Sequence, residues 1–127
     1  MEWRLKRAHQ ILDLMLASNV SRRIKWRAKA RVDTVDYDLL SKMKAAGCDS
    51  MELGVEIGNE QILKATKKGI TKPQVRDAVK FCKQIGIKPD LTFIIGHPNE
   101  TEKTVRETIN FAVELNSFQI AFGIMVP

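Results

Sequence analysis

The 127-residue sequence predicts an α/β fold in which about four parallel strands form a sheet with helices packed on one face. Three observations support this prediction. Segments with helical apolar spacing alternate with short strand-like runs along almost the whole chain. Capping residues or glycines stand at most of the boundaries between them. Each helical segment carries one apolar stripe, so each helix should cover the sheet with one side only.

The first predicted helix covers residues 2–19, where apolar side chains recur at intervals of three and four. A strand is predicted over residues 24–31, because apolar and cationic residues alternate strictly there. The apolar set is Ile24, Trp26, Ala28 and Ala30, and the cationic set is Lys25, Arg27, Lys29 and Arg31. A period of two places the two sets on opposite faces of the sheet.

The next helix and strand follow directly. Thr34 or Asp36 can cap the helix, and Gly47 can end it in a left-handed conformation. The buried stripe is predicted to be Leu39, Leu40, Met43 and Ala46. A second strand is predicted over residues 51–56, with Glu52, Gly54 and Glu56 facing away from Met51, Leu53 and Val55.

Two further helices and two strands complete the chain. A short helix is predicted over residues 60–67. A longer one follows, with a Thr71–Gln74 capping box, Pro73 in its first turn and Gly86 at its end. Its stripe is Val75, Ala78, Val79, Cys82 and Ile85. Residues 91–95 predict a central strand, residues 101–116 a helix, and residues 118–126 a last strand. The stripe of that last helix is expected to be Val105, Ile109, Ala112 and Val113.

Composition narrows the classes of protein that are possible. The net charge of +6 admits a nucleic-acid partner, but scattered cations without interleaved aromatic residues favour solvated helix faces, so no such partner is expected. The sequence contains no apolar run of roughly 18 residues and no signal-peptide pattern, which favours the cytoplasm. Cys48 and Cys82 are too far apart to indicate a disulfide scaffold or a metal motif.

In parallel α/β folds, ligands bind at the carboxyl ends of the strands. Glu56 ends its strand beside Gly54 and Gly58, and glycine lets a ligand approach the backbone, so a ligand role is expected for Glu56. Glu52, in contrast, is expected to form a structural ion pair with Lys25 or Arg27 on the neighbouring strand.

The turn after residue 95 joins a strand to the start of a helix, where free amides favour an anionic or polar ligand. Gly96 opens this turn, and Glu100 either caps the helix or contributes to a ligand site. His97 has no partner at metal-ligand spacing, so no metal site is predicted.

Taken together, these segments resemble the radical S-adenosylmethionine (SAM) superfamily. The segments that carry the resemblance are Ala30-Arg31-Val32-Asp33, Met43-Lys44-Ala45-Ala46-Gly47-Cys48, Gly54-Val55-Glu56-Ile57-Gly58 and Ile94-Ile95-Gly96-His97-Pro98-Asn99-Glu100-Thr101. Their order and spacing are most similar to the branch with a cobalamin-binding domain, which includes the anaerobic magnesium-protoporphyrin IX monomethyl ester cyclases. Two positions depart from the family pattern, which usually has Ser at Ile57 and Gly at Asn99.

The resemblance implies a partial, TIM-like (β/α) barrel of six parallel strands, of which residues 1–127 would be the C-terminal part, holding the third to sixth strands. It implies that Glu56 contacts the SAM ribose, and that Ile94 and Gly96 support the adenine. Gly54, Gly58 and Glu100 complete the implied cofactor site, and Arg31 is a further SAM or substrate contact.

The family also implies a [4Fe–4S] cluster, possible use of cobalamin, and reductive SAM cleavage followed by hydrogen abstraction from a small organic substrate. The CxxxCxxC motif that holds the cluster is absent from this chain, so the fragment alone should be catalytically silent. One alternative is a stand-alone basic α/β module that binds a protein or a nucleic acid, and another is a truncated TIM barrel of other chemistry. An excised barrel segment should also expose an apolar open face and self-associate through an edge strand.

Overall fold

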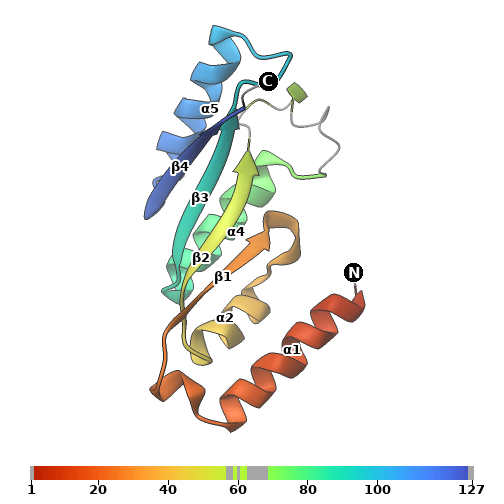
Figure 1. The fold of residues 1–127 in the computed structure, drawn as a ribbon, viewed down its shortest axis with the longest axis vertical. Helices are drawn as coiled ribbons and strands as arrows, with labels where there is room; N and C mark the ends of the chain where they lie inside the picture. The colour runs from red at the N-terminus through yellow and green to blue at the C-terminus, as the bar shows by residue number, and fades with distance from the viewer. Residues whose placement is uncertain (1, 57–58, 60, 63–68, 126–127) are drawn as a thin grey trace.

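The computed structural model describes residues 2–56, 59, 61–62 and 69–125 (Figure 1). The sheet has the order β1-β2-β3-β4, and every neighbouring pair is parallel. The strands are β1 (Trp26–Arg31), β2 (Cys48–Glu56), β3 (Lys88–Ile95) and β4 (Gln119–Ile124). The helices are α1 (Glu2–Ala17), α2 (Tyr37–Ala45), α4 (Lys72–Ile85) and α5 (Glu102–Leu115), with short 3₁₀ turns η1 (Val20–Arg22) and η2 (Val32–Thr34).

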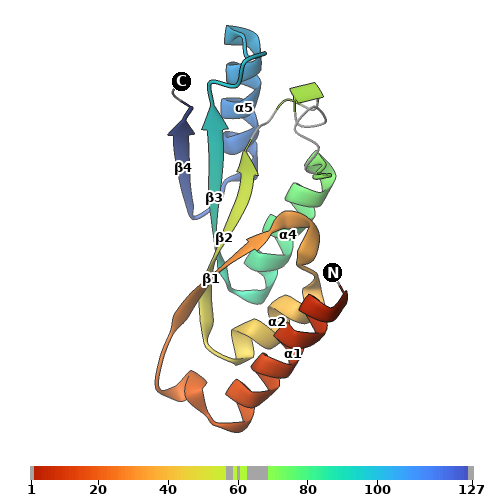
Figure 2. The same cartoon turned by 45° about the vertical axis from the view of Figure 1, so that its right-hand side comes forward.

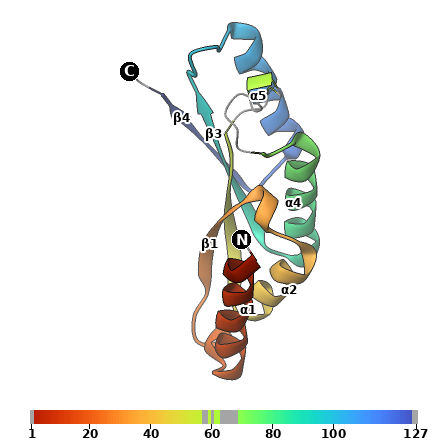
Figure 3. The same cartoon turned by 90° about the vertical axis from the view of Figure 1, so that its right-hand side faces the viewer.

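The helices lie on one side of the sheet. Figure 3 shows the sheet nearly edge-on, with α2, α4 and α5 along one side and the other side uncovered. Figure 2 shows the carboxyl ends of β2, β3 and β4 pointing toward the same end of the molecule. The predicted parallel sheet with one-sided helices is therefore confirmed. None of the described helices is long and apolar enough to cross a membrane.

The core lies between the sheet and the helix layer. Alternate β2 residues Met51, Leu53 and Val55 are fully buried, as the predicted period of two requires. They meet the buried stripes of α2 and α4, which match the predicted stripes except that Ile85 is only partly buried. Each large side chain buried in this way contributes roughly 1.5–3 kcal/mol of hydrophobic stabilisation.

Local capping signals place most helix boundaries. Asp36, not Thr34, caps α2, because its Oδ1 accepts a hydrogen bond of 2.7 Å from the Leu39 amide. The Thr34 hydroxyl instead donates to the Arg31 carbonyl at 2.8 Å. The predicted Thr71–Gln74 capping box is present at the start of α4.

The stripe predicted for α5 is wrong. The buried residues of this helix are Thr108, Phe111, Ala112 and Leu115, and only Ala112 belongs to the predicted set. Both sets have helical spacing, so periodicity alone does not distinguish them. The buried set contains a polar residue, Thr108, whose hydroxyl donates to the Thr104 carbonyl at 3.1 Å. Val113, from the predicted set, is 71% exposed.

Several strand boundaries also differ from the prediction. β1 begins at Trp26, which leaves Ile24 outside the strand and half exposed. Trp26 is held by a hydrogen bond of 2.9 Å from its Nε1 to the Ala46 carbonyl. β2 and β3 each begin three residues earlier than predicted. Apart from residues 61–62, which are helical, the short helix predicted over residues 60–67 lies outside the described residues.

Candidate functional site

The uncovered side of the sheet, called the open face here, is polar rather than apolar. Strand register and alternation place these residues on it: Arg27, Lys29, Arg31, Ser50, Glu52, Gly54, Asp90, Thr92, Ile94, Gln119, Ala121 and Gly123. The expectation of an apolar open face is therefore wrong. Large exposed apolar side chains lie elsewhere, and five of them are on α5 or around β4: Ile109, Val113, Phe118, Phe122 and Ile124. These positions lie at the end of the sheet order, where β4 has only β3 as a described neighbour.

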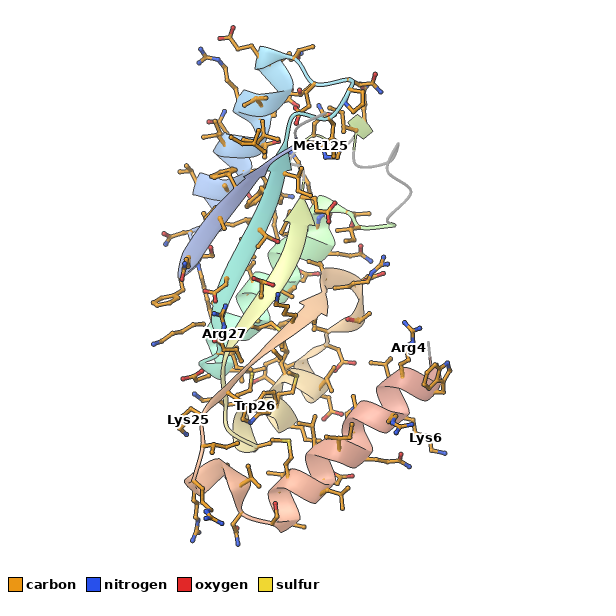
Figure 4. All side chains as sticks on the ribbon, viewed as in Figure 1. Arg4, Lys6, Lys25, Trp26, Arg27 and Met125 are labelled. Carbon is orange, nitrogen blue, oxygen red and sulfur yellow. The ribbon has the colours of Figure 1, made fainter. Side chains whose placement is uncertain are left out.

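Two ion pairs occupy the half of the open face nearer the amino ends of the strands. Lys29 lies opposite Glu52 in the register, and their charged atoms are 3.2 Å apart. Arg27 reaches past β2 to Asp90 on β3, with 2.7 Å between its Nη2 and Oδ2. The prediction that Glu52 pairs with Lys25 or Arg27 is therefore wrong, because the register places Lys29 opposite Glu52. Lys25 precedes β1, and Arg27 is already paired (Figure 4).

Small side chains occupy the other half of the open face, nearer the carboxyl ends of the strands. Gly54 pairs with Thr92, and Thr92 pairs with Ala121. A Cβ atom added to Gly54 would meet Thr92 Oγ1 as its nearest neighbour, at 3.8 Å, which is ordinary contact distance. The fold therefore does not require glycine at this position, and its missing side chain leaves space above the sheet.

Glu56 ends β2 in a strained conformation. Its φ is 73°, in the left-handed region, which costs a non-glycine residue about 1–3 kcal/mol. The register shifts between Gly54 and Glu56, so Glu56 pairs with Phe93 and the strand bulges at Val55. Strain of this kind clusters at functional sites. Gly58, the other glycine predicted beside Glu56, lies outside the described residues.

The Gly96 turn lies at the same end of the sheet as Glu56, as predicted. Glu56 ends β2, the turn follows β3, and these two strands are parallel neighbours (Figure 2). Gly96 has a φ of 102°, and an added Cβ would lie 3.1 Å from the Met125 carbonyl oxygen. The Met125 amide donates to the Ile95 carbonyl at 2.8 Å, so the end of β4 is fixed against this turn. Glycine is required here for both reasons. The preceding Ile94 is partly buried and faces the open side opposite Gly123.

Glu100 is not the cap of α5. Thr101 is the N-cap, and Thr101 and Thr104 exchange hydrogen bonds as a capping box. One oxygen of Glu100, Oε2, accepts from the Thr104 hydroxyl at 2.5 Å. Its other oxygen, Oε1, and the Nε2 atom of His97 are buried without a hydrogen-bond partner among the described residues. Sequence reasoning gave His97 no role, and nothing in the local pattern marks this buried nitrogen.

A second contact missed by the sequence joins Asn59 to α5. The Asn59 amide donates to Glu107 Oε2 on α5 at 2.5 Å, and Asn59 Oδ1 accepts from the Ile62 amide. Arg31, the further SAM or substrate contact implied by the resemblance, ends β1 opposite Gly54 and forms a two-bond ion pair with Asp33 at 3.0 and 3.1 Å. The structure therefore groups Gly54, Glu56, Ile94 and Gly96 at one end of β2 and β3, with Arg31 beside them on β1 and Glu100 beyond the turn.

The two cysteines do not form a metal site. Both are buried free thiols. Burial raises the pKa of Cys48 to about 11 and that of Cys82 to about 11, so neither is a thiolate at neutral pH. The described part of the chain contains no group of three or more His, Cys, Asp or Glu residues placed to hold a metal ion.

A parallel sheet covered on one side, with glycines and an acid at the carboxyl ends of its strands, is the architecture of a segment of a βα-barrel. The chain belongs to the radical SAM superfamily, whose family model matches residues 4–112. The resemblance inferred from the sequence is thereby confirmed.

The similar proteins are much longer than this chain. It is 39% identical over 104 residues to an uncharacterized methyltransferase, PH0819, of Pyrococcus horikoshii, a match that covers 82% of this chain and 23% of that protein. It is 28% identical to the anaerobic magnesium-protoporphyrin IX monomethyl ester cyclase of Cereibacter sphaeroides, with 84% and 18% covered. The chain thus spans about a fifth of these relatives.

Solved structures share the fold. The radical SAM methyltransferase TsrM of Kitasatospora setae superposes with a TM-score of 0.82 at 20% identity, over 91% of this chain and 24% of that one. Coproporphyrinogen III oxidase (HemN) of Escherichia coli superposes with a TM-score of 0.77 at 18% identity, over 91% and 28%. The predicted barrel segment is confirmed by these likenesses.

Proposed function

We propose that this chain is the SAM-supporting part of a radical SAM barrel, and that the full protein cleaves SAM reductively and abstracts hydrogen from a small organic substrate. The observation that carries the proposal is the strained Glu56 at the carboxyl end of β2, beside the space above Gly54 and at the same end as the Gly96 turn. The family membership gives this arrangement its chemical meaning.

The residues at this end suit the parts of SAM. The Glu56 carboxylate can accept hydrogen bonds from the ribose hydroxyls, and Gly54 leaves room for the sugar against the sheet. Ile94 offers an apolar contact for the adenine beside the Gly96 turn. Buried polar atoms without partners are uncommon and need an explanation, and the Glu100 oxygen and the His97 nitrogen lie in and just after this turn. Arg31 and Gly58 complete the proposed site.

The [4Fe–4S] cluster of the family does not fit this chain. Cluster iron is held by cysteine thiolates, and the two cysteines here are buried, protonated at neutral pH and not arranged as a metal site. In the full protein the cluster would supply the electron that cleaves SAM. The residues of this chain bind and orient the SAM adenosine, and the chain alone is catalytically silent. Reconstitution with iron and sulfide should give no cluster absorption that survives desalting, and a cluster that depends on either cysteine would contradict this.

The names of the relatives bear on the reaction class and the cofactors of the full protein. They include methyltransferases, methylthiotransferases and cyclases by name, and the TsrM structure contains cobalamin and a [4Fe–4S] cluster. We therefore include cobalamin among the cofactors of the full protein. We also place the protein in the cytoplasm, because its two buried thiols are unpaired, as is usual in a reducing compartment.

The test is SAM binding, measured by ligand-observed NMR on the purified chain. We expect weak binding, because the adenosine contacts are present and the cluster is not. Glu56→Gln should abolish the signal. The matched control is Asp77→Asn, which removes the same charge from an exposed position on α4. Equal SAM binding by the chain and both variants, with unchanged thermal unfolding, would remove Glu56 from the site.

A further inference from the structure

The positive charge of this protein is concentrated in its first quarter. Residues 1–31 contain nine of the 21 cations and two of the 15 acids, which is a net charge of +7. Residues 32–127 contain twelve cations and thirteen acids, a net charge of −1. The positive net charge therefore comes from residues 1–31, and such an asymmetry indicates an anionic partner.

The structure divides these nine cations into two groups. Arg27, Lys29 and Arg31 face the open side of the sheet and are paired with Asp90, Glu52 and Asp33. The other six are exposed, and none of them forms an ion pair within the described part of the chain: Arg4, Lys6, Arg7, Arg22, Arg23 and Lys25. We call these six residues the basic strip.

Among the side chains that the structure describes on α1, the one acid is Asp13, and it is paired with Lys42 of α2 at 2.8 Å rather than with the basic strip. Figure 4 shows Arg4 and Lys6 near the N-terminal end of α1, and Lys25 beyond its other end, just before β1. A helix of 16 residues is about 24 Å long. The basic strip is therefore as long as several phosphate spacings of a nucleic-acid strand, and longer than any single small anion.

One aromatic residue accompanies the strip. Trp3 is 62% exposed, and the Arg4 guanidinium lies over its ring, 5.4 Å from the centroid. An exposed indole beside cations is suited to stacking on an unpaired base. A lipid surface fits less well, because the apolar stripe of α1 (Leu5, Ala8, Leu12, Met15 and Leu16) packs against the core. The large apolar side chains that α1 leaves exposed are Trp3, Ile11 and Leu14, which form a much smaller face than the large apolar moment of a membrane-surface helix.

We infer that the basic strip binds single-stranded nucleic acid, with the six cations contacting phosphates and Trp3 stacking on a base. This inference is independent of SAM binding, since the strip contains none of the residues proposed for the SAM site. It adds a macromolecular contact surface to the barrel segment.

The experiment is fluorescence anisotropy with labelled oligouridylate and oligothymidylate of about 12 nucleotides, within the usual site size, over a range of salt concentrations. If all six cations contact phosphates, the slope of log affinity against log salt should be about −4. Two triple variants, R4Q/K6Q/R7Q and R22Q/R23Q/K25Q, should each weaken binding and reduce the slope by about 2. Trp3→Ala should weaken binding at least about fivefold with the slope unchanged.

The matched control is K80Q/K103Q/R106Q, which removes the same charge from exposed positions on α4 and α5. It should leave the slope unchanged, and circular dichroism should show all variants folded. Equal weakening by the control would overturn the inference that the basic strip is the binding surface, because only the net charge of the protein would then matter. Absence of oligonucleotide binding at low salt would also overturn it, as would binding to phosphatidylserine vesicles without oligonucleotide binding. Stronger binding of uridylate or of thymidylate would each support it and identify RNA or DNA as the preferred strand.

Discussion

Adding one methyl group at Gly54 separates a binding role from a structural one. The backbone of Gly54 is not left-handed, and the nearest atom to an added Cβ is Thr92 Oγ1, at 3.8 Å. An alanine that fits its native backbone conformation usually stabilises a protein by about 0.4–1 kcal/mol. We therefore expect Gly54→Ala to leave the free energy of unfolding unchanged or slightly raised. The same methyl group would occupy the space above the sheet where SAM is proposed to lie, so SAM binding should weaken.

Gly96→Ala is the contrasting variant. The residue has a φ of 102°, and the new Cβ would lie 3.1 Å from a backbone oxygen, that of Met125, which cannot rotate away. The expected loss is about 1–3 kcal/mol in the free energy of unfolding. Urea titration followed by the fluorescence of the partly buried Trp26, together with SAM binding by NMR, would give both quantities. If Gly54→Ala destabilised the protein by more than Gly96→Ala, or bound SAM as well as the unaltered chain, the reasoning would be refuted.

Three further predictions concern packing and association. Arg27→Gln should lower the free energy of unfolding in urea by about 1–3 kcal/mol, because it leaves the buried Asp90 carboxylate without its partner. Lys29→Gln breaks a more exposed pair and should lower it by at most about 1 kcal/mol. Equal losses for the two variants would show that burial of the carboxylate is not the cause. Burial raises the pKa of Cys48 and that of Cys82 from 9.0 to about 11, so the folded state keeps both protons longer than the unfolded state does. Stability should therefore fall as pH rises from about 9 to about 11, by up to about 2–3 kcal/mol for each thiol, and Cys82→Ala should remove about half of that fall. Self-association through the edge of β4 should be detected by light scattering and reversed by Ile124→Lys, and a monomer at high concentration would contradict it.

Predictions that rest on neighbouring residues agree with the structure. The capping box of Thr71 and Gln74 and the left-handed end at Gly86 depend on a few adjacent positions, and both are present. The parallel order of the strands also follows from local alternation, because βα units can be wound in few ways. The sheet and most of its helices could therefore be predicted from the sequence.

Features that depend on register or on packing could not be predicted in this way. The partner of Glu52 is decided by which β1 residue lies opposite it, and a shift of two residues separates Arg27 from Lys29. The buried side of α5 depends on where the helix sits over the sheet, since two stripes compete. The positive φ of Glu56 arises from a register shift between two strands that are distant in sequence. The grouping of Gly54, Glu56 and Gly96 was expected from topology, but its strain was not.

The docking of the β4 end on the Gly96 turn has a consequence for local opening. β4 pairs with one described strand and is exposed along most of its length, so its hydrogen bonds should exchange with solvent faster than those of β2 and β3. Whenever β4 opens, the turn loses the Met125 amide that holds the Ile95 carbonyl. A ligand that needs the turn in its closed shape must then bind at the expense of the open state. Amide exchange in β4 should slow when that ligand is added, although no atom of β4 need touch it.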